Sequence, residues 1–207
     1  MVSSITLKNL IIGYHSKHQL RAIASPVHAS LQAGELTCLI GANGVGKSTL
    51  LRTLAGFQPA LDGEILIQDK SLSDFSAQEL AREISIVLTS KTDHAQLSAE
   101  EIVGIGRSPY TGFWGTLSTA DKQIVASALQ ETGIQHLAQR NISELSDGER
   151  QKVMIAKALA QQTRIIILDE PTAFLDFPSK IETLQMLRRL AHEPVSYTHL
   201  RAHETRH

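Results

Sequence analysis

The sequence is poor in several features that would have placed the protein in a specialised class. It has one cysteine, Cys38, so it cannot form a disulfide framework, and a reducing compartment is expected. No apolar run approaches the length of a membrane span, and residues 1–10 lack the basic and then apolar order of a secretion signal. Its 20 Lys and Arg residues nearly balance its 21 Asp and Glu residues. That balance argues against a protein whose main task is to coat nucleic acid.

The most informative stretch is residues 35–54, ELTCLIGANGVGKSTLLRTL. An apolar run over 36–40 predicts a strand, in which Cys38 is expected to be a small buried hydrophobic residue. A glycine-rich loop follows, and a helix is expected to begin near Lys47. This order is typical of phosphate binding, because glycines let successive N–H groups turn inward and the helix N-terminus adds its dipole. We expect Lys47 to reach the β- and γ-phosphates and the Ser48 hydroxyl to bind Mg²⁺.

The rest of the chain, 207 residues in all, predicts one α/β domain with an inserted helical part. Apolar patterns indicate strands over 5–12, 27–31, 65–68, 84–88 and 165–168. Helix starts are marked by a Ser followed three positions later by an acidic residue, which is typical of a capping box. The pairs are Ser76 with Glu79, Ser98 with Glu101 and Ser118 with Asp121. Further helices are expected over 151–160 and 178–192, and a loop over 104–115.

Two acids stand at the end of the strand predicted over 165–168. Ligands of open α/β sheets gather at the carboxyl ends of the strands, so Asp169 is expected to join Ser48 at the metal. Glu170 would then polarise a water for in-line attack on the γ-phosphate. The plain alternatives are a glycine turn with Lys47 on the surface, and two acids that only cap a strand.

Four motifs together resemble the ATP-binding cassette (ABC) ATPases. They are GANGVGKST at 41–49, LSDGE at 145–149, IIILDEPT at 165–172 and FLD at 174–176, in the order found in that family. The passage GRSPYTGFWG followed by LSTAD resembles the ATPase subunits of importers for iron–siderophore, haem or cobalamin. The resemblance implies a P-loop NTPase fold with a mixed sheet core, an N-terminal antiparallel β part and an inserted helical subdomain.

The resemblance also implies a role for individual residues. Tyr14 stands where the family places an aromatic ring that stacks on adenine. Ser146, Gly148 and Glu149 would hold the γ-phosphate of ATP bound to the opposite subunit, although an ordinary N-cap is the alternative for this motif. Nucleotide contacts along the phosphate loop are implied for Gly41, Ala42, Asn43, Gly44, Val45, Gly46, Lys47, Ser48 and Thr49.

Three positions depart from the family pattern. Asp147 replaces a glycine and sets a carboxylate near phosphate, while Glu149 replaces a more usual Gln. Thr89 stands where the family has a Gln that senses the γ-phosphate and couples to the membrane partner. A Thr can still bind Mg²⁺, but its reach is shorter, so coupling through residue 89 is in doubt.

The resemblance further implies a division of the chain. Residues 1–89 and 161–193 would form the nucleotide-binding core, and 90–160 a helical subdomain. Residues 194–207, PVSYTHLRAHETRH, instead resemble translated sequencing-adapter read-through, so a non-native, disordered tail without a strand is expected there. His199, His203 and His207 could otherwise be taken for a metal site, but they have no flanking scaffold.

The sequence therefore predicts the MgATP-hydrolysing subunit of an ABC importer. It would work as a homodimer or with a paired ATPase subunit, and would be cytoplasmic, touching the inner face of the plasma membrane only through permease subunits. No nucleic acid partner is expected. The alternatives are a soluble ABC ATPase acting on DNA or ribosomes, a P-loop small-molecule kinase, and a fragment that binds ATP without hydrolysing it.

Overall fold

The computed structural model describes residues 3–16, 19–23, 25–88, 96–112, 114–192 and 198–204. An antiparallel sheet forms one side of the molecule, with strand order β4-β1-β6-β7. Its strands are β1 (Ser3–Ile11), β4 (Val27–Gln32), β6 (Asp62–Ile67) and β7 (Lys70–Ser71). β2 (Gly13–Ser16) and β3 (Gln19–Ala22) make a separate two-stranded hairpin. The predicted N-terminal antiparallel part is confirmed.

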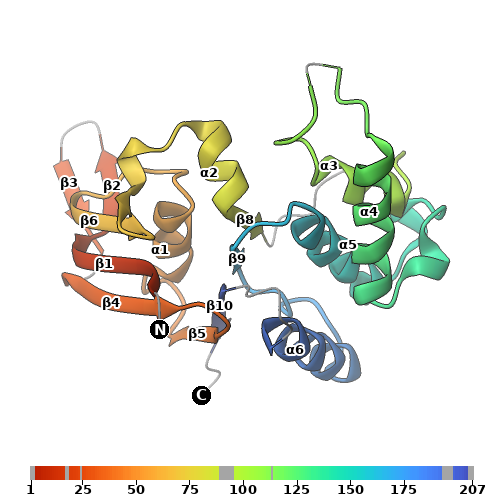
Figure 1. Cartoon of the computed structure of the whole chain (residues 1–207). Coiled ribbons are helices and arrows are strands. Elements are labelled where there is room, and N and C mark those ends of the chain that lie inside the picture. The colour runs from red at the N-terminus through yellow and green to blue at the C-terminus, as the bar shows by residue number, and fades with distance from the viewer. Residues whose placement is uncertain are drawn as a thin grey trace.

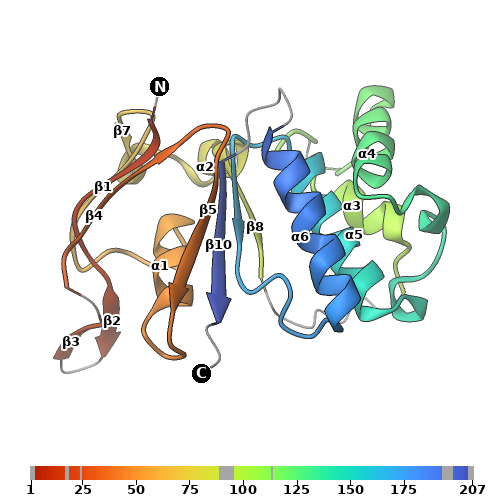
Figure 2. The same ribbon diagram turned by 90° about the horizontal axis from the view of Figure 1, so that it is seen from below.

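A parallel sheet forms the centre, with strand order β5-β10-β9-β8. Its strands are β5 (Leu36–Gly41), β8 (Ile84–Val87), β9 (Ile165–Leu168) and β10 (Thr198–Glu204). Helix α1 (Lys47–Leu54) lies between the two sheets, and α5 (Asp147–Ala160) and α6 (Phe177–His192) lie on the other face of the parallel sheet (Figures 1 and 2). The result is a layered α/β domain, as the sequence predicts.

Strand β9 joins the two hydrophobic cores because its side chains alternate between them. Ile165 and Ile167 pack in the cluster formed with the antiparallel sheet and α1. Ile166 and Leu168 pack in the cluster formed with the helices. All four side chains are buried, as expected for a central parallel strand covered on both faces. The residues that follow β9 therefore begin from a rigid support.

The helical part begins where the sequence places its capping boxes. Boxes open α2 (Ala77–Glu83), α3 (Ala99–Ile105) and α4 (Thr119–Glu131), as predicted. The prediction for α5 is wrong at its start, since the helix begins at Asp147 and not at 151. A fourth capping box, between Ser146 and Glu149, stabilises that additional first turn. α5 packs against α3, α4 and α6 and also against β8, so it joins the helical part to the sheet.

The prediction of no strand after residue 193 is also wrong. Residues Thr198–Glu204 form β10, which pairs in parallel with β5 on one side and β9 on the other. The backbone N–H and C=O groups of both neighbours need partners, and backbone pairing depends little on which side chains the inserted strand carries. The prediction that residues 194–207 are foreign to the protein is not decided by this pairing and stays a prediction.

Cys38 is exposed, contrary to the prediction that it is buried. It lies on β5, one of the two edge strands of the parallel sheet. Neither hydrophobic cluster of the described residues includes a residue of β5, and Ile40 on the same strand is 64% exposed. An apolar run therefore predicted the strand correctly, but it could not show how little of that strand is covered.

Arg107, which follows α3, joins three helices of the helical part. It is 5% exposed, and its Nε donates to Asp121 Oδ1 of α4 at 2.8 Å. Its Nη1 donates to the carbonyl oxygen of Ala160, at the end of α5, at 2.8 Å and to Gln162 Oε1 at 3.0 Å. The guanidinium also stacks over the Tyr110 ring, 4.1 Å from its centre. The predicted loop over 104–115 is thus held in place at its start.

The Asp121 carboxylate predicts a measurable pH dependence of stability. Hydrogen bonds from Ser118 and from Arg107 lower the pKa of Asp121 to about 2. A carboxyl with a lowered pKa in the folded state stabilises the fold above its unfolded pKa, near 4, and loses that contribution as pH falls toward 2. We expect Asp121→Asn to be less stable than the parent at pH 6, with the difference shrinking between about pH 4 and pH 2. Urea unfolding at several pH values measures this, and a constant difference would contradict it.

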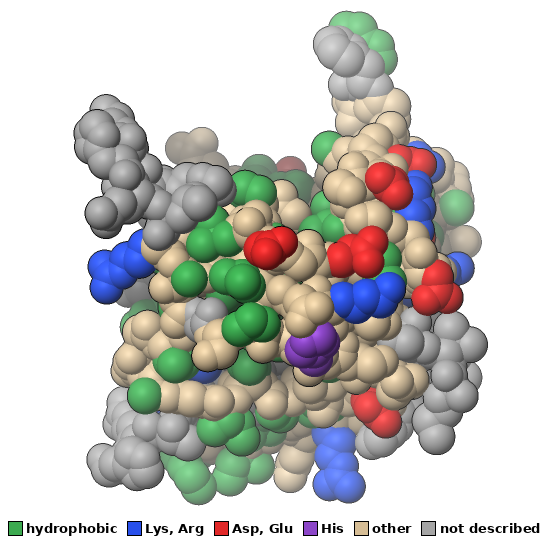
Figure 3. Space-filling view, turned by 90° about the vertical axis from the view of Figure 1, so that its left-hand side faces the viewer, with side chains coloured by type: hydrophobic (Ala, Val, Ile, Leu, Met, Phe, Trp, Pro, Cys, Tyr) green, Lys and Arg blue, Asp and Glu red, His purple; other side chains and the backbone are tan. Residues whose placement is uncertain are grey.

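The surface of the molecule carries mixed charge. On the face drawn in Figure 3, acidic and basic side chains lie among hydrophobic ones, without a continuous basic stripe. Ion pairs such as Lys8 with Glu64, at 3.5 Å, contribute to this mixture.

Within the described residues, none of the helices has the length and apolar character needed to cross a membrane.

Candidate functional site

The loop between β5 and α1 has the backbone conformation that its glycines allow. Gly44 has φ 77° and Gly46 has φ 105°, both in the left-handed region that other residues rarely adopt. A Cβ on Gly46 would also lie 2.6 Å from Ile23 Cγ2. The glycine at position 46 is therefore required both by the bend and by the side chain packed against it.

Lys47 opens α1 and turns back over this loop. Its Nζ donates to the carbonyl oxygens of Gly41, at 2.8 Å, and Ala42, at 3.0 Å. The residue is only 7% exposed. The loop therefore holds a cation at the helix N-terminus, where the dipole already favours an anion. The alternative of a glycine turn with Lys47 on the surface is excluded.

The structure brings Ser48 and Asp169 together across 121 positions of sequence. The Ser48 hydroxyl donates to Asp169 Oδ1 at 3.0 Å, and Asp169 is 6% exposed. The backbone N–H of Asp169 donates to the carbonyl oxygen of Val87, which fixes it at the end of β8 and β9. A hydroxyl and a carboxylate side by side are hard oxygen ligands that suit Mg²⁺. The residues present therefore fit the predicted metal.

Glu170 follows directly and has an unusual backbone. Its φ is 49°, in the left-handed region, although it is not a glycine. The conformation is held between the buried strand β9 and a turn in which the N–H of Ala173 donates to the carbonyl oxygen of Glu170 at 3.1 Å. Backbone strain of this kind is concentrated at functional sites, which supports a chemical role for Glu170.

Tyr14, predicted to stack on adenine, lies beside the phosphate loop. Its hydroxyl is hydrogen-bonded to Thr49 Oγ1 at 2.8 Å, while 51% of the residue is exposed. Thr49 is 5% exposed. This bond joins the β2–β3 hairpin to α1, and sequence reasoning missed it because nothing in the spacing of two residues 35 positions apart signals it.

The LSDGE residues at 145–149, called the signature motif below, form a helix cap. The Ser146 hydroxyl accepts from the N–H of Glu149. The backbone N–H and the hydroxyl of Ser146 both donate to Glu149 Oε2, and these two bonds lower the pKa of Glu149. The Asp147 carboxylate forms an ion pair with Arg150 at 3.1 Å. This pairing partly offsets the negative charge that Asp147 brings to the motif. In the described part of the chain no hydrogen bond links Ser146 or Glu149 to the phosphate loop, and α5 and α1 lie on opposite faces of the parallel sheet (Figures 1 and 2). Their phosphate role, and that of Gly148, stays a prediction.

Several predicted residues lie outside the described part. Thr89, the third predicted metal ligand, is among them. The backbones of His199 and His203 belong to β10, but their side chains are not described, and His207 is not described at all. In the described residues as a whole, no group of three or more His, Cys, Asp and Glu side chains could hold a metal ion.

Comparison with known proteins now decides the family. A family model described as ABC transporter matches residues 24–173, which contain the phosphate loop, the signature motif and both acids. The chain belongs to the ABC transporter family of ATP-binding proteins. The ABC resemblance predicted from the four motifs is thereby confirmed.

Two relatives show how much of an ABC protein the chain represents. An ABC transporter ATP-binding protein of Methanocaldococcus jannaschii is 40% identical over 186 residues, which are 90% of this chain and 63% of that protein. The iron(3+)-hydroxamate import ATP-binding protein FhuC of Bacillus subtilis is 37% identical over 192 residues, 93% of this chain and 70% of FhuC. The chain thus spans about two thirds of the length of these ABC relatives.

Solved structures confirm the ABC fold. A metal-chelate type ABC transporter in an inward-facing conformation has a TM-score of 0.81 and 28% identity, covering 97% of this chain and 73% of that one. A dimeric ATP-binding cassette in a post-hydrolysis state, bound to ADP and Pi, has a TM-score of 0.80 and 26% identity, covering 96% and 88%.

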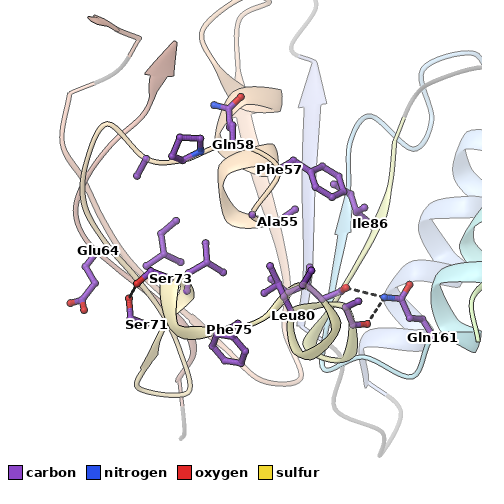
Figure 4. Close-up of a pocket in the computed structure, with 18 of the residues that line it drawn as sticks. Ala55, Phe57, Gln58, Glu64, Ser71, Ser73, Phe75, Leu80, Ile86 and Gln161 are labelled. Atoms are coloured by element: carbon purple, nitrogen blue, oxygen red, sulfur yellow. Dashed lines mark hydrogen bonds between the residues drawn. The ribbon is translucent and has the colours of Figure 1, made fainter. Parts of the chain in front are cut away.

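This ABC chain also has a cavity of about 860 Å³ away from the phosphate loop. Figure 4 shows Phe57, Leu80 and Ile86 around it, and Gln161 of the segment after α5, whose amide donates to the carbonyl oxygens of Ala81 and Ile84. Neither the loop at 41–49 nor the acids at 169 and 170 line this cavity. It is therefore distinct from the nucleotide site.

Proposed function

We propose that this chain binds MgATP and hydrolyses it to ADP and inorganic phosphate as the ATPase subunit of an importer. The observation that carries the proposal is the 3.0 Å hydrogen bond between Ser48 and Asp169, because it joins the phosphate loop to the acids that follow β9. A phosphate loop alone would fit many P-loop proteins, including kinases. The signature helix cap at Ser146 and the family membership favour an ABC ATPase over a kinase.

In the proposed reaction each group of the site has one role. Backbone N–H groups of the loop and the Lys47 ammonium bind the β- and γ-phosphates and offset the charge that develops on them. Ser48 and Asp169 would hold Mg²⁺, which neutralises phosphate charge when it is bound. Glu170 accepts a proton from a water, whose oxygen forms a bond to the γ-phosphorus as the bond to the β–γ bridging oxygen breaks. The products are ADP and inorganic phosphate.

The proposed partners are a second ATPase subunit and permease subunits. A dimeric cassette bound to ADP and Pi is among the structural neighbours, and Ser146, Gly148 and Glu149 would complete the site of the opposite subunit. The subunit would contact the inner face of the plasma membrane only through its permease.

For cargo we propose an iron–siderophore complex, supported by the likeness to FhuC and to a metal-chelate type transporter. Haem and cobalamin stay predictions of the sequence.

Calorimetric titration with ATP, with and without Mg²⁺, tests the proposal directly. We expect the parent chain to bind ATP more tightly with Mg²⁺, and Asp169→Asn to reduce that gain about tenfold, because it removes an anionic ligand. Asp74→Asn changes an exposed aspartate outside the site and should leave the gain intact. Equal Mg²⁺ dependence in the parent and in Asp169→Asn would contradict the metal role.

A further inference from the structure

The hairpin that carries Tyr14 has little support of its own. Within the part of the chain that the structure describes, β2 and β3 pair only with each other and belong to neither of the larger sheets. A two-stranded hairpin is marginally stable at best in water, so its position depends on contacts with the rest of the protein. Those contacts decide where the Tyr14 ring lies relative to the phosphate loop.

Two contacts of described residues connect the hairpin region to the phosphate loop and its helix. Ile23, directly after β3, packs against Gly46, where a Cβ would come within 2.6 Å of its Cγ2. The Tyr14 hydroxyl and Thr49 Oγ1 form a 2.8 Å hydrogen bond. Thr49 is 5% exposed and lies within α1, so the position of its hydroxyl is set by the helix. Tyr14, in contrast, is 51% exposed. The phenol oxygen is therefore held while much of the ring stays open to a ligand.

We infer that Thr49 is a positioning residue, whose hydroxyl holds the Tyr14 ring as a platform for the nucleotide base at a set place beside the phosphate loop. The inference rests on the proposed binding of ATP. Without the bond, the side chain has to be ordered when the base binds, and that cost weakens binding. Phenylalanine at position 14, which keeps the aromatic face, should therefore not be equivalent to tyrosine.

Titration calorimetry with two ligands tests the inference on the whole chain. The ligands are MgATP, which has a base, and magnesium tripolyphosphate, which has none. We expect Tyr14→Phe to bind MgATP about two- to tenfold more weakly, the usual effect of one hydrogen bond, with tripolyphosphate binding unchanged. A role of Tyr14 in merely supporting the loop would weaken both ligands equally, and that result would overturn the inference.

A double-mutant cycle isolates the bond from other roles of Thr49. Thr49 is itself a predicted nucleotide contact, so Thr49→Val alone can weaken binding for two reasons. Adding Tyr14→Phe to Thr49→Val should cause no further loss of MgATP affinity, because the bond is already absent. Thr49→Ser, which keeps a hydroxyl, should restore most of the affinity. Additive losses in the double variant would overturn the inference.

Further variants separate this inference from the proposed function. Tyr110→Phe removes a phenol hydroxyl outside the site and should bind MgATP like the parent. If Tyr14→Phe also binds like the parent while Tyr14→Ala binds weakly, the ring acts without the Thr49 bond and the inference fails, although ATP binding stands. If the parent binds neither ligand, the proposed function fails and the inference fails with it.

Discussion

Replacing Lys47 with Ala is expected to weaken ATP binding by about 100-fold, because it removes a charged partner of the phosphates whose position the loop fixes. The Lys47 ammonium already lies over the loop, bonded to the carbonyl oxygens of Gly41 and Ala42. Binding therefore needs no large movement of the helix or the loop. Fluorescence titration with a labelled ATP analogue measures the change.

The fold should survive this substitution, since the two carbonyl oxygens belong to the glycine-rich loop and water can take the place of the ammonium. Circular dichroism and thermal unfolding of Lys47→Ala should match the parent. Lys122→Ala, which changes an exposed lysine of α4, is the matched control and should bind ATP like the parent. Retained affinity in Lys47→Ala would mean that this loop does not bind the triphosphate.

Replacing Glu170 with Gln is expected to lower kcat for ATP hydrolysis by about 1,000-fold while leaving the affinity for ATP nearly unchanged. The amide keeps the size of the side chain but cannot accept the proton of the attacking water. Since bound ATP would no longer be consumed, an ATP-bound dimer should accumulate. Phosphate release and size-exclusion chromatography with MgATP measure the two effects.

Two comparisons make the Glu170 result specific. Glu35→Gln changes an exposed glutamate outside the site and should hydrolyse ATP at the parent rate. Asp169→Asn should alter the Mg²⁺ dependence of ATP binding, whereas Glu170→Gln should not. Hydrolysis by Glu170→Gln at the parent rate would show that another group activates the water. A parent chain that binds MgATP but shows no turnover would favour the alternative of a fragment that binds without hydrolysing.

Local features of the fold follow from local sequence. The capping boxes at Ser76, Ser98 and Ser118 were predictable because their bonds join residues three positions apart. The same reasoning should have placed the start of α5 at Asp147, since Ser146 and Glu149 have the same spacing. The strand over 165–168 was predictable because a fully buried strand needs a continuous apolar run.

The wrong predictions concern the neighbours that a segment has in the folded protein. Cys38 is in an apolar strand but is exposed, because neither described hydrophobic cluster covers β5. β10 was not predicted at all, because its place between β5 and β9 is set by backbone pairing and not by an apolar pattern of its own. Exposure and pairing of this kind depend on neighbours that are distant in sequence.

By itself, the sequence determined the phosphate loop, the two acids and most elements of the core, because glycine spacing, capping and apolar runs act over a few residues. Its four motifs also gave the resemblance to the family. The sequence predicted that Asp169 joins Ser48, and the tertiary structure shows the hydrogen bond between them. Only the tertiary structure decided that Lys47 bonds to the carbonyl oxygen of Gly41 and that Tyr14 bonds to Thr49. These contacts join residues that different strands and helices bring together. Their geometry comes from how the two sheets and α1 pack, which no local pattern encodes.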